Sequence, residues 1–402
     1  ALNKILKDMV VRSQQMLGRD ARYIPGWDCH GLPIEWKIEE KYRQKGRDKD
    51  AVPLVEFRQE CREFAAGWVD VQREEFKRLG VTGNWGDPYL TMDFHAEAVI
   101  AEELQKFVMN GMLYQGSKPV MWSPIEKTAL AEAEVEYHDH QSHTIWVKFP
   151  VVNFTGENDV FSGKVDVVIW TTTPWTIPQN RAICFGDGIS YGLYEVTGRP
   201  EECWLSIGDK YLVADSLAEQ VFTQARLDGT MYRRLCDVSA GDLAQMTCAH
   251  PLRGAEGADG EWDYDVPLLS GDHVTDEAGT GFVHTAPSHG DDDYQVGLKH
   301  NLPMTYNIME DGGFRADLPL FGGKYILNRK GKEGDANGAV IDKLVEVGAL
   351  LARGRLTHSY PHSWRSKAPL IFRNTAQWFI SMETNELREN ALKAIDATDF
   401  YP

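Results

Sequence analysis

The sequence predicts an α/β protein in which a β-rich segment interrupts a helical one. Apolar residues recur at helical spacing through the first 115 residues. Between residues 144 and 284, short β-type runs are separated by Gly, Pro and Asn turns, which is typical of a barrel-like or mixed β domain. From about His358 the chain is aromatic, and it becomes helical again from Glu383. A length of 402 residues fits two or three domains.

Four helices are predicted before residue 115. Leu2, Leu6 and Met9 begin the first amphipathic helix, and Gly18 is a suitable end for it. Asp93 is a candidate N-cap for the fourth helix. We expect the helices to surround a sheet whose first strand lies upstream, because the chain starts inside a helix. The predicted spans are 2–17, 34–45, 57–79 and 93–111.

Six strands are predicted in the β-rich segment. Each is a run of β-branched, aromatic or other apolar residues that turn residues bound on both sides. Their spans are 144–149, 165–170, 182–185, 191–196, 211–213 and 281–284.

Composition and charge indicate a globular protein. Apolar residues make up 43% and charged residues 25%, and no apolar run is long enough to span a membrane. The net charge of −18 argues against nucleic-acid binding through bulk charge but allows a local basic surface. Residues 1–50 carry 11 basic and 8 acidic side chains, whereas residues 255–320 carry 2 and 14.

The first residues and the cysteines indicate what kind of chain this is and in which compartment it folds. The first residues contain neither an initiator Met nor a signal-peptide pattern, so we expect a piece of a longer protein. The six cysteines are scattered without a CxxC pair, which favours reduced side chains in a cytosolic protein.

The first unusual segment is a rigid turn at residues 25–35. Two glycines and two prolines there can aim Asp28 and His30 into a cleft, with Trp27 as a wall. A simple loop in which Asp28 caps the next helix explains the same residues. A Cys29 nucleophile with His30 as its base is disfavoured, because adjacent side chains of an extended segment point in opposite directions.

The second unusual segment follows the predicted strand 165–170 and reads WTTTPWTIPQNR. Its four threonine hydroxyls at a strand end can donate to and accept from a polar ligand, and its prolines fix the loop. Threonines also favour strands and turns without any ligand, so this segment alone leaves both interpretations open.

The third segment, at residues 284–294, reads HTAPSHGDDDY. Aspartates in the first turn of a helix stay ionised and can hold a substrate ammonium. Ordinary helix-start charge is the simpler interpretation of Asp291 and Asp292. A metal site made of His284, His289 and Asp293 is disfavoured, because no two histidines share a helix face at i,i+4 spacing.

Together these segments are far more specific than any one of them. With them, the whole chain resembles the bacterial isoleucyl-tRNA synthetases, which are class I aminoacyl-tRNA synthetases. The HIGH and KMSKS signatures of that family are absent, so the chain holds no predicted ATP-binding residue. The matching motifs are GWDCHGLPIE at 26–35, ALAEAEVEY at 129–137, WTTTPWTIPQNRA at 170–182, GTGFVHTAPSHGDDD at 279–293 and QWFISM at 377–382.

The resemblance implies a split Rossmann-like catalytic domain, interrupted by a β-rich, barrel-like editing domain. The complete enzyme would join isoleucine to tRNA(Ile) with ATP and Mg²⁺, and would hydrolyse mischarged valyl-tRNA(Ile). We expect a cytoplasmic monomer without a membrane partner. The implied divisions are 1–115 (first synthetic part), 116–140 (connector), 141–330 (editing), 331–357 (return connector) and 358–402 (second synthetic part).

The resemblance also implies site residues. In the synthetic site, Asp28 would hold the isoleucine ammonium and Trp378 would line the side-chain pocket. In the editing site, Asp293 would hold the ammonium of valine, the threonines would orient the terminal adenosine and a water, and His284 would form the floor. No nucleophilic triad is visible, so we expect a positioned water to attack. The implied editing residues are Thr171, Thr172, Thr173, Asn180, His284 and Asp293.

Members of this family often carry zinc-binding cysteines near the two crossings between the domains. Here the corresponding neighbourhoods contain Ser123, Ser363 and Ser366, and neutral serine is a poor zinc ligand. We therefore predict no zinc in this chain and expect packing to hold the connector.

Two alternative functions are a free-standing trans-editing deacylase and an inactive tRNA-binding relative.

Overall fold

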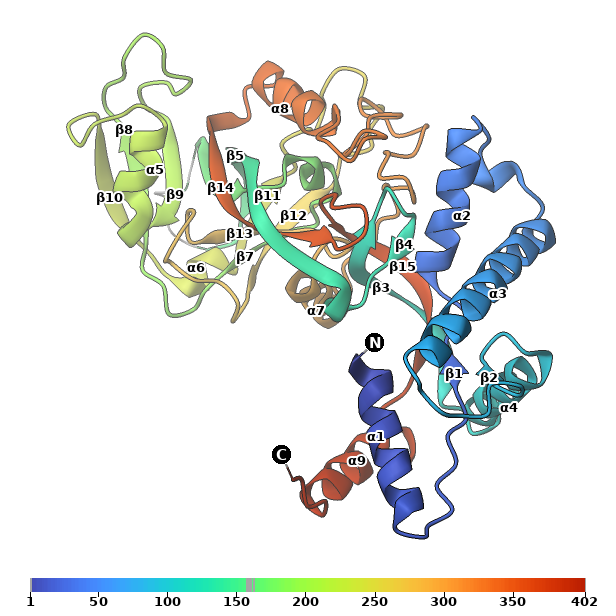
Figure 1. The fold of residues 1–402 in the computed structure, drawn as a ribbon. Helices are drawn as coiled ribbons and strands as arrows, with labels where there is room; N and C mark the ends of the chain where they lie inside the picture. The colour runs from blue at the N-terminus through green and yellow to red at the C-terminus, as the bar shows by residue number, and fades with distance from the viewer. Residues whose placement is uncertain (1, 157–160, 162, 402) are drawn as a thin grey trace. The chain divides into compact units, whose positions relative to one another are not determined.

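The computed structural model describes residues 2–156, 161 and 163–401, and the chain divides into two compact units (Figure 1). The first unit comprises Ala1–Gln115 and Trp378–Pro402, and the second comprises Gly116–Gln377. The chain passes from one to the other within β3 (Leu113–Ser123) and again within β15 (Ile371–Ile380). The predicted α/β class is confirmed, with a large mixed sheet in the second unit.

The first unit is mainly helical. The four helices predicted before residue 115 are confirmed, with ends that differ by a few residues. Asp93 occupies the N-cap position of the fourth helix, but its side chain makes no capping hydrogen bond. The helices are α1 (Leu2–Met16), α2 (Leu32–Gln44), η1 (Lys49–Ala51), α3 (Leu54–Arg78), α4 (Phe94–Met109), η6 (Thr384–Glu386) and α9 (Leu387–Asp396).

A two-stranded parallel sheet supports the 25–35 turn. It pairs β1 (Gly26–Trp27) with β2 (Tyr89–Leu90). Cys29 is buried beside this pair in a small core with residues of α3. Burial raises the pKa of the Cys29 thiol and so disfavours the thiolate that a nucleophile needs.

The second unit contains a ten-stranded mixed sheet within its described residues. The strand order is β10-β8-β9-β6-β5-β11-β12-β7-β13, and β14 pairs with β5. The pairs β6–β9 and β12–β7 are parallel. All six predicted strands are confirmed. The strands are β5 (Val135–Phe154), β6 (Val165–Thr171), β7 (Ala182–Phe185), β8 (Tyr191–Val196), β9 (Lys210–Ala214), β10 (Tyr232–Val238), β11 (Met246–Ala249), β12 (Asp265–Ser270), β13 (Phe282–Thr285) and β14 (Leu350–Ser363).

Helices and 3-10 turns occupy the connections of this sheet. They are η2 (Glu132–Glu134), η4 (Pro174–Gln179), η5 (Asp215–Leu217), α5 (Ala218–Gln224), α6 (Ala240–Leu243), α7 (Asp291–His300) and α8 (Ala336–Glu346). No helix of the described residues is long and apolar enough to cross a bilayer.

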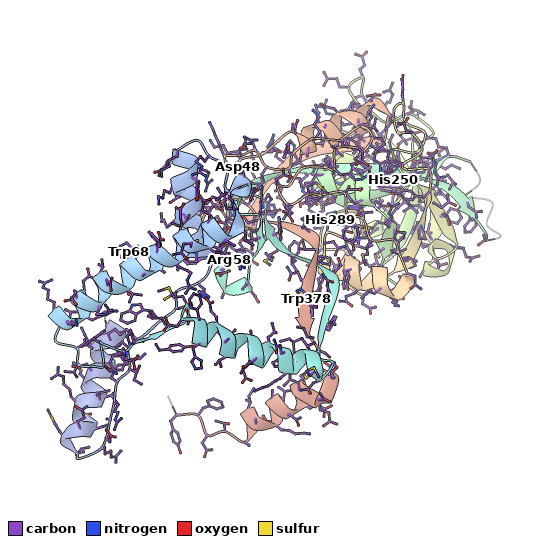
Figure 2. All side chains as sticks on the ribbon, turned by 90° about the vertical axis from the view of Figure 1, so that its right-hand side faces the viewer. Asp48, Arg58, Trp68, His250, His289 and Trp378 are labelled. Atoms are coloured by element: carbon purple, nitrogen blue, oxygen red, sulfur yellow. The ribbon has the colours of Figure 1, made fainter. Side chains whose placement is uncertain are left out.

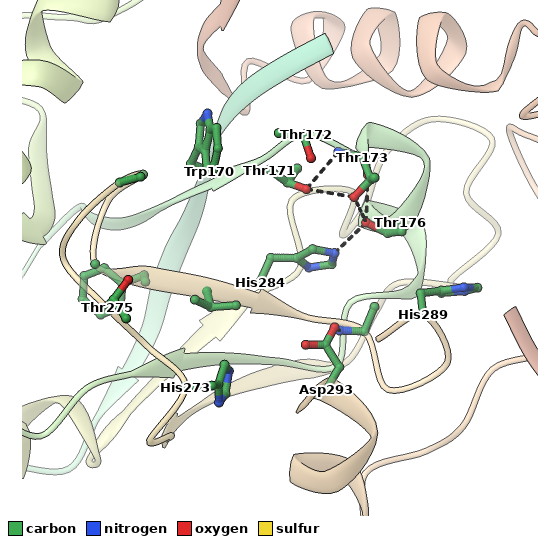
Figure 3. Close-up of a pocket in the computed structure, with 16 residues that line it drawn as sticks. Trp170, Thr171, Thr172, Thr173, Thr176, His273, Thr275, His284, His289 and Asp293 are labelled. Atoms are coloured by element: carbon green, nitrogen blue, oxygen red, sulfur yellow. Dashed lines mark hydrogen bonds between the residues drawn. The ribbon is translucent and has the colours of Figure 1, made fainter. Parts of the chain in front are cut away.

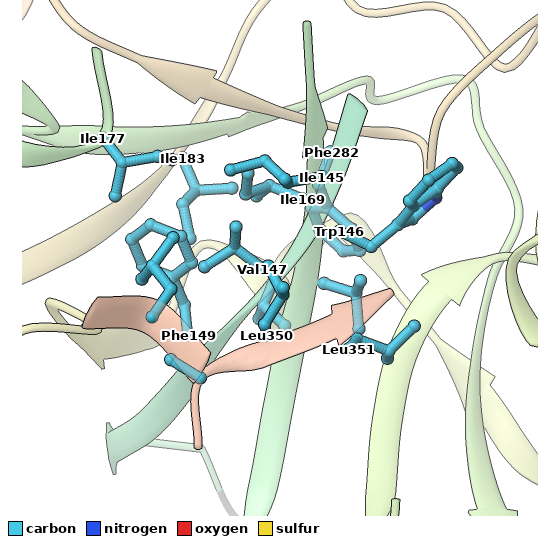
Figure 4. Close-up of a cluster of buried hydrophobic side chains, with 14 of the residues drawn as sticks. Ile145, Trp146, Val147, Phe149, Ile169, Ile177, Ile183, Phe282, Leu350 and Leu351 are labelled. Carbon is cyan, nitrogen blue, oxygen red and sulfur yellow. The ribbon is translucent and has the colours of Figure 1, made fainter. Parts of the chain in front are cut away.

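The long strand β5 organises the core of the second unit. It pairs with β14, β6 and β11 along successive parts of its length. Its middle residues Ile145, Val147 and Phe149 are fully buried against β6 and β14 (Figure 4). Each such side chain contributes on the order of 1.5–3 kcal/mol by leaving water. This core holds the end of β6, where the threonine segment begins.

The connector is held by more than packing, contrary to our prediction. A three-stranded sheet joins β15, β3 and β4 (Thr128–Ala129). Between β3 and β4, the carboxylate of Glu126 is buried and accepts hydrogen bonds from Ser363 Oγ at 2.7 Å and from the Ser366 backbone N–H at 3.0 Å. Ser123 Oγ accepts the Glu126 backbone N–H at 3.2 Å. The three serines named at the domain crossings thus all form hydrogen bonds with Glu126.

All six cysteines are free, as predicted. Cys184, Cys203 and Cys248 are buried in the second unit, where they fill the core as small apolar side chains.

Candidate functional site

A cavity of about 350 Å³ brings the second and third sequence segments together (Figure 3). It lies where β6 ends, beside β13 and the start of α7. The predicted residues Thr171, Thr172, Thr173, His284 and Asp293 line it, whereas Asn180 does not. The remaining lining residues are Trp170, Thr176, His273, Thr275, Ala278, Gly279, Gly281, Phe282, Val283, Ala286 and His289.

The threonines form a hydrogen-bonded turn at one wall. Thr171 Oγ1 lies 3.1 Å from Thr173 Oγ1 and also accepts the backbone N–H of Thr173 at 3.1 Å. Thr176 Oγ1 donates to the Thr173 carbonyl at 2.8 Å. Within the described residues, the Thr172 hydroxyl makes no hydrogen bond, so it keeps its full capacity for a ligand.

His284 is buried at the base of the cavity, and both of its ring nitrogens are occupied. Nδ1 lies 2.7 Å from the side-chain amide of Asn180, and Nε2 lies 3.0 Å from Thr176 Oγ1. Burial lowers the pKa of His284 to about 3. The imidazole is therefore neutral near pH 7 and supplies shape and polarity. Asn180 does not line the cavity, and its amide orients the imidazole through this hydrogen bond.

Asp293 places a carboxyl group in the cavity from the first turn of α7. Its Oδ2 accepts the Ala286 backbone N–H at 2.8 Å (Figure 3). Burial raises the pKa of Asp293 to about 7, although the Ala286 N–H acts in the opposite direction. Gly290 leaves room for this carboxyl group, since a Cβ there would lie 3.3 Å from Asp293 Cγ.

The opposite wall is the segment 271–281, which our sequence analysis did not include in the site. Gly279 has φ +84°, and a Cβ there would lie 3.2 Å from the Trp170 ring. Ser216 Oγ donates to Asp276 at 2.9 Å and anchors the segment to η5. Gly279 and Gly281, close together in GDHVTDEAGTG, were the available signal, and both have the positive φ that favours glycine.

His289 also belongs to the site but was predicted only as a disfavoured metal ligand. Its Nδ1 lies 2.9 Å from the Phe372 carbonyl, and its ring meets Trp175 edge-on with centroids 4.9 Å apart. Burial lowers the pKa of His289 to about 4. His289 thus joins the start of α7 to both the threonine turn and β15.

Asp28 and Trp378 both belong to the first unit, and neither lines this cavity. Asp28 follows β1, where its Oδ1 accepts the His30 backbone N–H at 3.3 Å and the Thr91 hydroxyl at 3.4 Å. Asp28 does not cap α2, whose N-cap is Gly31. Trp378 on β15 is 67% exposed (Figure 2). Both side chains are accessible to a ligand.

The described residues contain no group of three or more His, Cys, Asp and Glu side chains arranged to hold a metal ion. The ring centroid of His362 on β14 lies 5.3 Å from that of His138 and 5.7 Å from that of His140, both on β5. The absence of zinc remains a prediction for metal analysis.

A family model described as tRNA synthetases class I (I, L, M and V) matches residues 1–402. The chain belongs to this family. The predicted resemblance is thereby confirmed across the whole chain.

Individual relatives carry a more specific name. The isoleucine–tRNA ligase of Ruegeria pomeroyi is 64% identical over 98% of this chain and 41% of its own length. Those of Caulobacter vibrioides and Rhodopseudomonas palustris are 56% and 55% identical over 100% of this chain and 42% of their own lengths. The chain therefore spans about two fifths of these curated relatives.

Solved structures of editing domains are weakly similar. The structure entitled GlLeuRS-CP1 matches 39% of this chain and 61% of its own, with 20% identity and a TM-score of 0.30. The Plasmodium knowlesi cytosolic leucyl-tRNA synthetase editing domain matches 41% and 66%, with 12% identity and a TM-score of 0.32.

Proposed function

We propose that this chain is the editing part, and a portion of the synthetic part, of an isoleucine–tRNA ligase. Its cavity would hydrolyse the ester between valine and the 3′ end of tRNA(Ile). The observation that carries this proposal is the convergence of one carboxyl group, a threonine turn and a neutral histidine in a single cavity. Membership of the class I synthetase family supplies the substrate class.

In this proposal, Asp293 holds the ammonium group of the esterified amino acid. A buried carboxylate forms a strong charge-assisted hydrogen bond with an ammonium group. The exposed Asp291 and Asp292 precede it in the same helical turn but do not line the cavity. Asp293 is therefore the one member of the acidic run that we assign to the substrate.

A positioned water is the proposed nucleophile. Its oxygen bonds to the ester carbonyl carbon, the bond from that carbon to the ribose oxygen breaks, and the ribose oxygen gains a proton from the water. The products are free valine and tRNA. The hydroxyls of Thr171, Thr172 and Thr173 would orient the water and the terminal adenosine. His284 does not act as a base, because both of its nitrogens are already hydrogen-bonded.

A second site is needed because the synthetic pocket for isoleucine also admits the smaller valine. One methylene group gives too little discrimination, a limit for which this synthetase family is the standard worked case. A cavity that admits valine and rejects isoleucine would add a second selection. We propose that the Trp170 ring and the His284 ring limit its size.

The first unit would belong to a split Rossmann-like synthetic domain. Asp28 follows β1 and Thr91 follows β2, so both stand at the carboxyl ends of parallel strands, where α/β folds bind ligands. We propose that Asp28 holds the isoleucine ammonium and that Trp378 lines its pocket. The division at 1–115, 116–140, 141–330, 331–357 and 358–402, with a barrel-like editing domain, is part of this proposal.

ATP with Mg²⁺, isoleucine and tRNA(Ile) are the proposed partners of the complete enzyme, a cytoplasmic monomer. ATP would be bound outside this chain. In the complete enzyme, Asp28→Ala should abolish isoleucine-dependent ATP–pyrophosphate exchange and leave deacylation of valyl-tRNA(Ile) nearly unchanged. Equal loss of both activities in a folded variant would contradict the assignment of Asp28.

The decisive experiment measures deacylation of valyl-tRNA(Ile) by the 402-residue chain. The wild-type chain should release valine, and Asp293→Ala should lose this activity because the ammonium has no partner. Asp291→Ala is the matched control, since it removes an exposed carboxylate from the same turn. A folded Asp293→Ala variant with full activity would refute the site. No deacylation by any variant would favour an inactive tRNA-binding relative.

A further inference from the structure

A turn at residues 328–332 presents three exposed cations. Asn328 Oδ1 accepts the backbone N–H groups of Lys330 and Lys332 at 2.9 and 3.3 Å, and the Asn328 N–H donates to the Lys332 carbonyl at 2.8 Å. Arg329, Lys330 and Lys332 are all exposed, and no ion pair joins them to a carboxylate of the described residues. Their charge is available to a partner.

The turn is fixed in place by its neighbours. Gly331 has φ +70°, and a Cβ there would lie 2.8 Å from Ala368 Cβ. Leu327 and Glu333 form the β-bridge that closes the turn. The Glu333 carboxylate is already engaged by His143 at 2.8 Å and by the Asn337 amide at 3.2 Å. Among the described residues, Glu333 forms no ion pair with Arg329, Lys330 or Lys332.

A second, narrow cavity of about 50 Å³ lies between the base of this turn and the threonine segment of the candidate site. Leu327 and Glu333, on which the turn closes, line it. Thr172 and Thr173 line both this cavity and the larger one. The residues that close the basic turn and Thr172 thus line the same small cavity, and Thr172 also lines the larger one.

Charge is distributed unequally around the site. The opposite wall, residues 271–281, contains Asp272, Asp276 and Glu277. More broadly, residues 255–320 carry 14 acidic and 2 basic side chains, whereas residues 321–377 carry 4 and 10. A polyanion is repelled along the acidic wall and attracted along the side that contains the turn.

We infer that Arg329, Lys330 and Lys332 bind the phosphates of the single-stranded 3′ end of the tRNA whose ester enters the larger cavity. This inference rests on the proposed function and adds the direction from which the strand arrives. Contacts of this kind are salt-dependent and independent of base sequence, because bound phosphates release counterions. The turn therefore contributes affinity for tRNA and leaves the hydrolytic step to the larger cavity.

The test compares two triple variants of the 402-residue chain. Arg329→Gln, Lys330→Gln and Lys332→Gln remove the turn's charge. Lys210→Gln, Arg226→Gln and Arg233→Gln remove the same charge from β9, the turn after α5 and β10. Titrations of tRNA(Ile) over a salt series should show at least about tenfold weaker binding for the turn variant and a salt slope smaller by about 2. The control variant should bind as the wild-type chain does.

Hydrolysis assays distinguish a loss of tRNA binding at the turn from damage to the larger cavity. The turn variant should have a raised KM for valyl-tRNA(Ile), an unchanged kcat, and unchanged hydrolysis of 3′-O-valyladenosine, which carries no phosphate. Binding equal to that of the control, or equal loss on both substrates, would overturn the inference. If the wild-type chain binds tRNA through the turn but hydrolyses neither substrate, the proposed function fails while the RNA-binding surface stands.

Discussion

The Asn180 side-chain amide donates a hydrogen bond of 2.7 Å to His284 Nδ1. The same amide nitrogen donates to the Ala182 carbonyl at 2.8 Å, and a carbonyl only accepts, so the orientation of the amide is determined. His284 must therefore carry its proton on Nε2 and donate it to Thr176 Oγ1. Thr176 in turn donates to the Thr173 carbonyl, which links the imidazole to the threonine turn.

This chain of hydrogen bonds predicts the state of His284. We expect nitrogen chemical shifts to show the neutral, Nε2-protonated tautomer from pH 8 down to pH 5, because burial lowers the pKa of His284 to about 3. In Asn180→Ala, His284 should no longer be restricted to the Nε2-protonated tautomer. The unfolding free energy should fall by about 1–3 kcal/mol, since Nδ1 loses its donor. Deacylation should fall as well.

Gln179→Ala is the control for this variant. Gln179 is also a buried amide, and it donates to the Trp175 carbonyl without touching His284. Its loss should leave the His284 shifts unchanged. If Asn180→Ala and Gln179→Ala give the same shifts, then Asn180 does not hold the tautomer.

Asp293 predicts the pH dependence of deacylation. The ammonium binds the carboxylate form, and burial raises the pKa of Asp293 to about 7. The kcat/KM for valyl-tRNA(Ile) should therefore rise as the pH increases through about 7, then level or fall as the substrate amine loses its proton near pH 8. In Asp293→Asn, the kcat/KM of the remaining activity should no longer decrease below about pH 7, so the acid limb of the pH profile is lost. An unchanged acid limb would assign it to another group.

Buried histidines predict how stability depends on pH. Burial lowers the pKa of His250 to about 3, whereas an unfolded histidine titrates near 6.5. Below that unfolded value the unfolded chain binds a proton that the folded chain rejects, so unfolding free energy falls as the pH decreases from about 6.5 toward 3. Each such histidine contributes a slope of up to about 1.4 kcal/mol per pH unit.

Denaturant titrations of wild type and His250→Gln between pH 7 and 5 test this linkage. His250 donates to the Ile177 carbonyl and accepts the Leu252 N–H, and glutamine can partly replace both contacts. The variant should be less stable at pH 7, with a smaller loss on acidification. Parallel curves for the two proteins would show that His250 is not responsible.

Glu126 predicts a stability contribution at the connector. Glu126→Ala should cost about 1–3 kcal/mol, because Ser363 Oγ and the Ser366 N–H lose a buried charged acceptor. Glu132→Ala, at an exposed position of the same connector, is the control and should change stability by about 0.5 kcal/mol or less. Equal effects of the two changes in denaturant titrations would contradict the role of Glu126.

Local patterns in the sequence predicted much of the fold and much of the site. The predicted strands were recognisable because each one is a short apolar run between turn residues. Thr171 was recognisable because the threonines stand at the end of a strand, and Asp293 because the aspartates begin the helix that follows one. Gly279 was not, since its role depends on packing against Trp170, more than 100 residues away. Glu126 was missed for the same reason: its partner Ser363 lies 237 residues further along the chain.

The last prediction concerns zinc. Structural zinc requires four thiolate or imidazole ligands in a closed tetrahedron. Around the connector, the described residues offer Ser123, Ser363 and Ser366, and their hydrogen bonds are directed to or from Glu126. The Glu126 carboxylate accepts the bonds from Ser363 and Ser366, and the Glu126 backbone N–H donates to Ser123, so Glu126 joins the two turns.

Metal analysis of the chain purified without a chelator should therefore find far less than one zinc per chain, and later dialysis against a chelator should cause no loss of stability. The histidine cluster of His138, His140 and His362 is the remaining source of nitrogen ligands. The triple substitution of these histidines by asparagine separates the two sources. Retention of one zinc per chain by this variant, with unfolding on its removal, would place a metal at the serines and overturn the prediction.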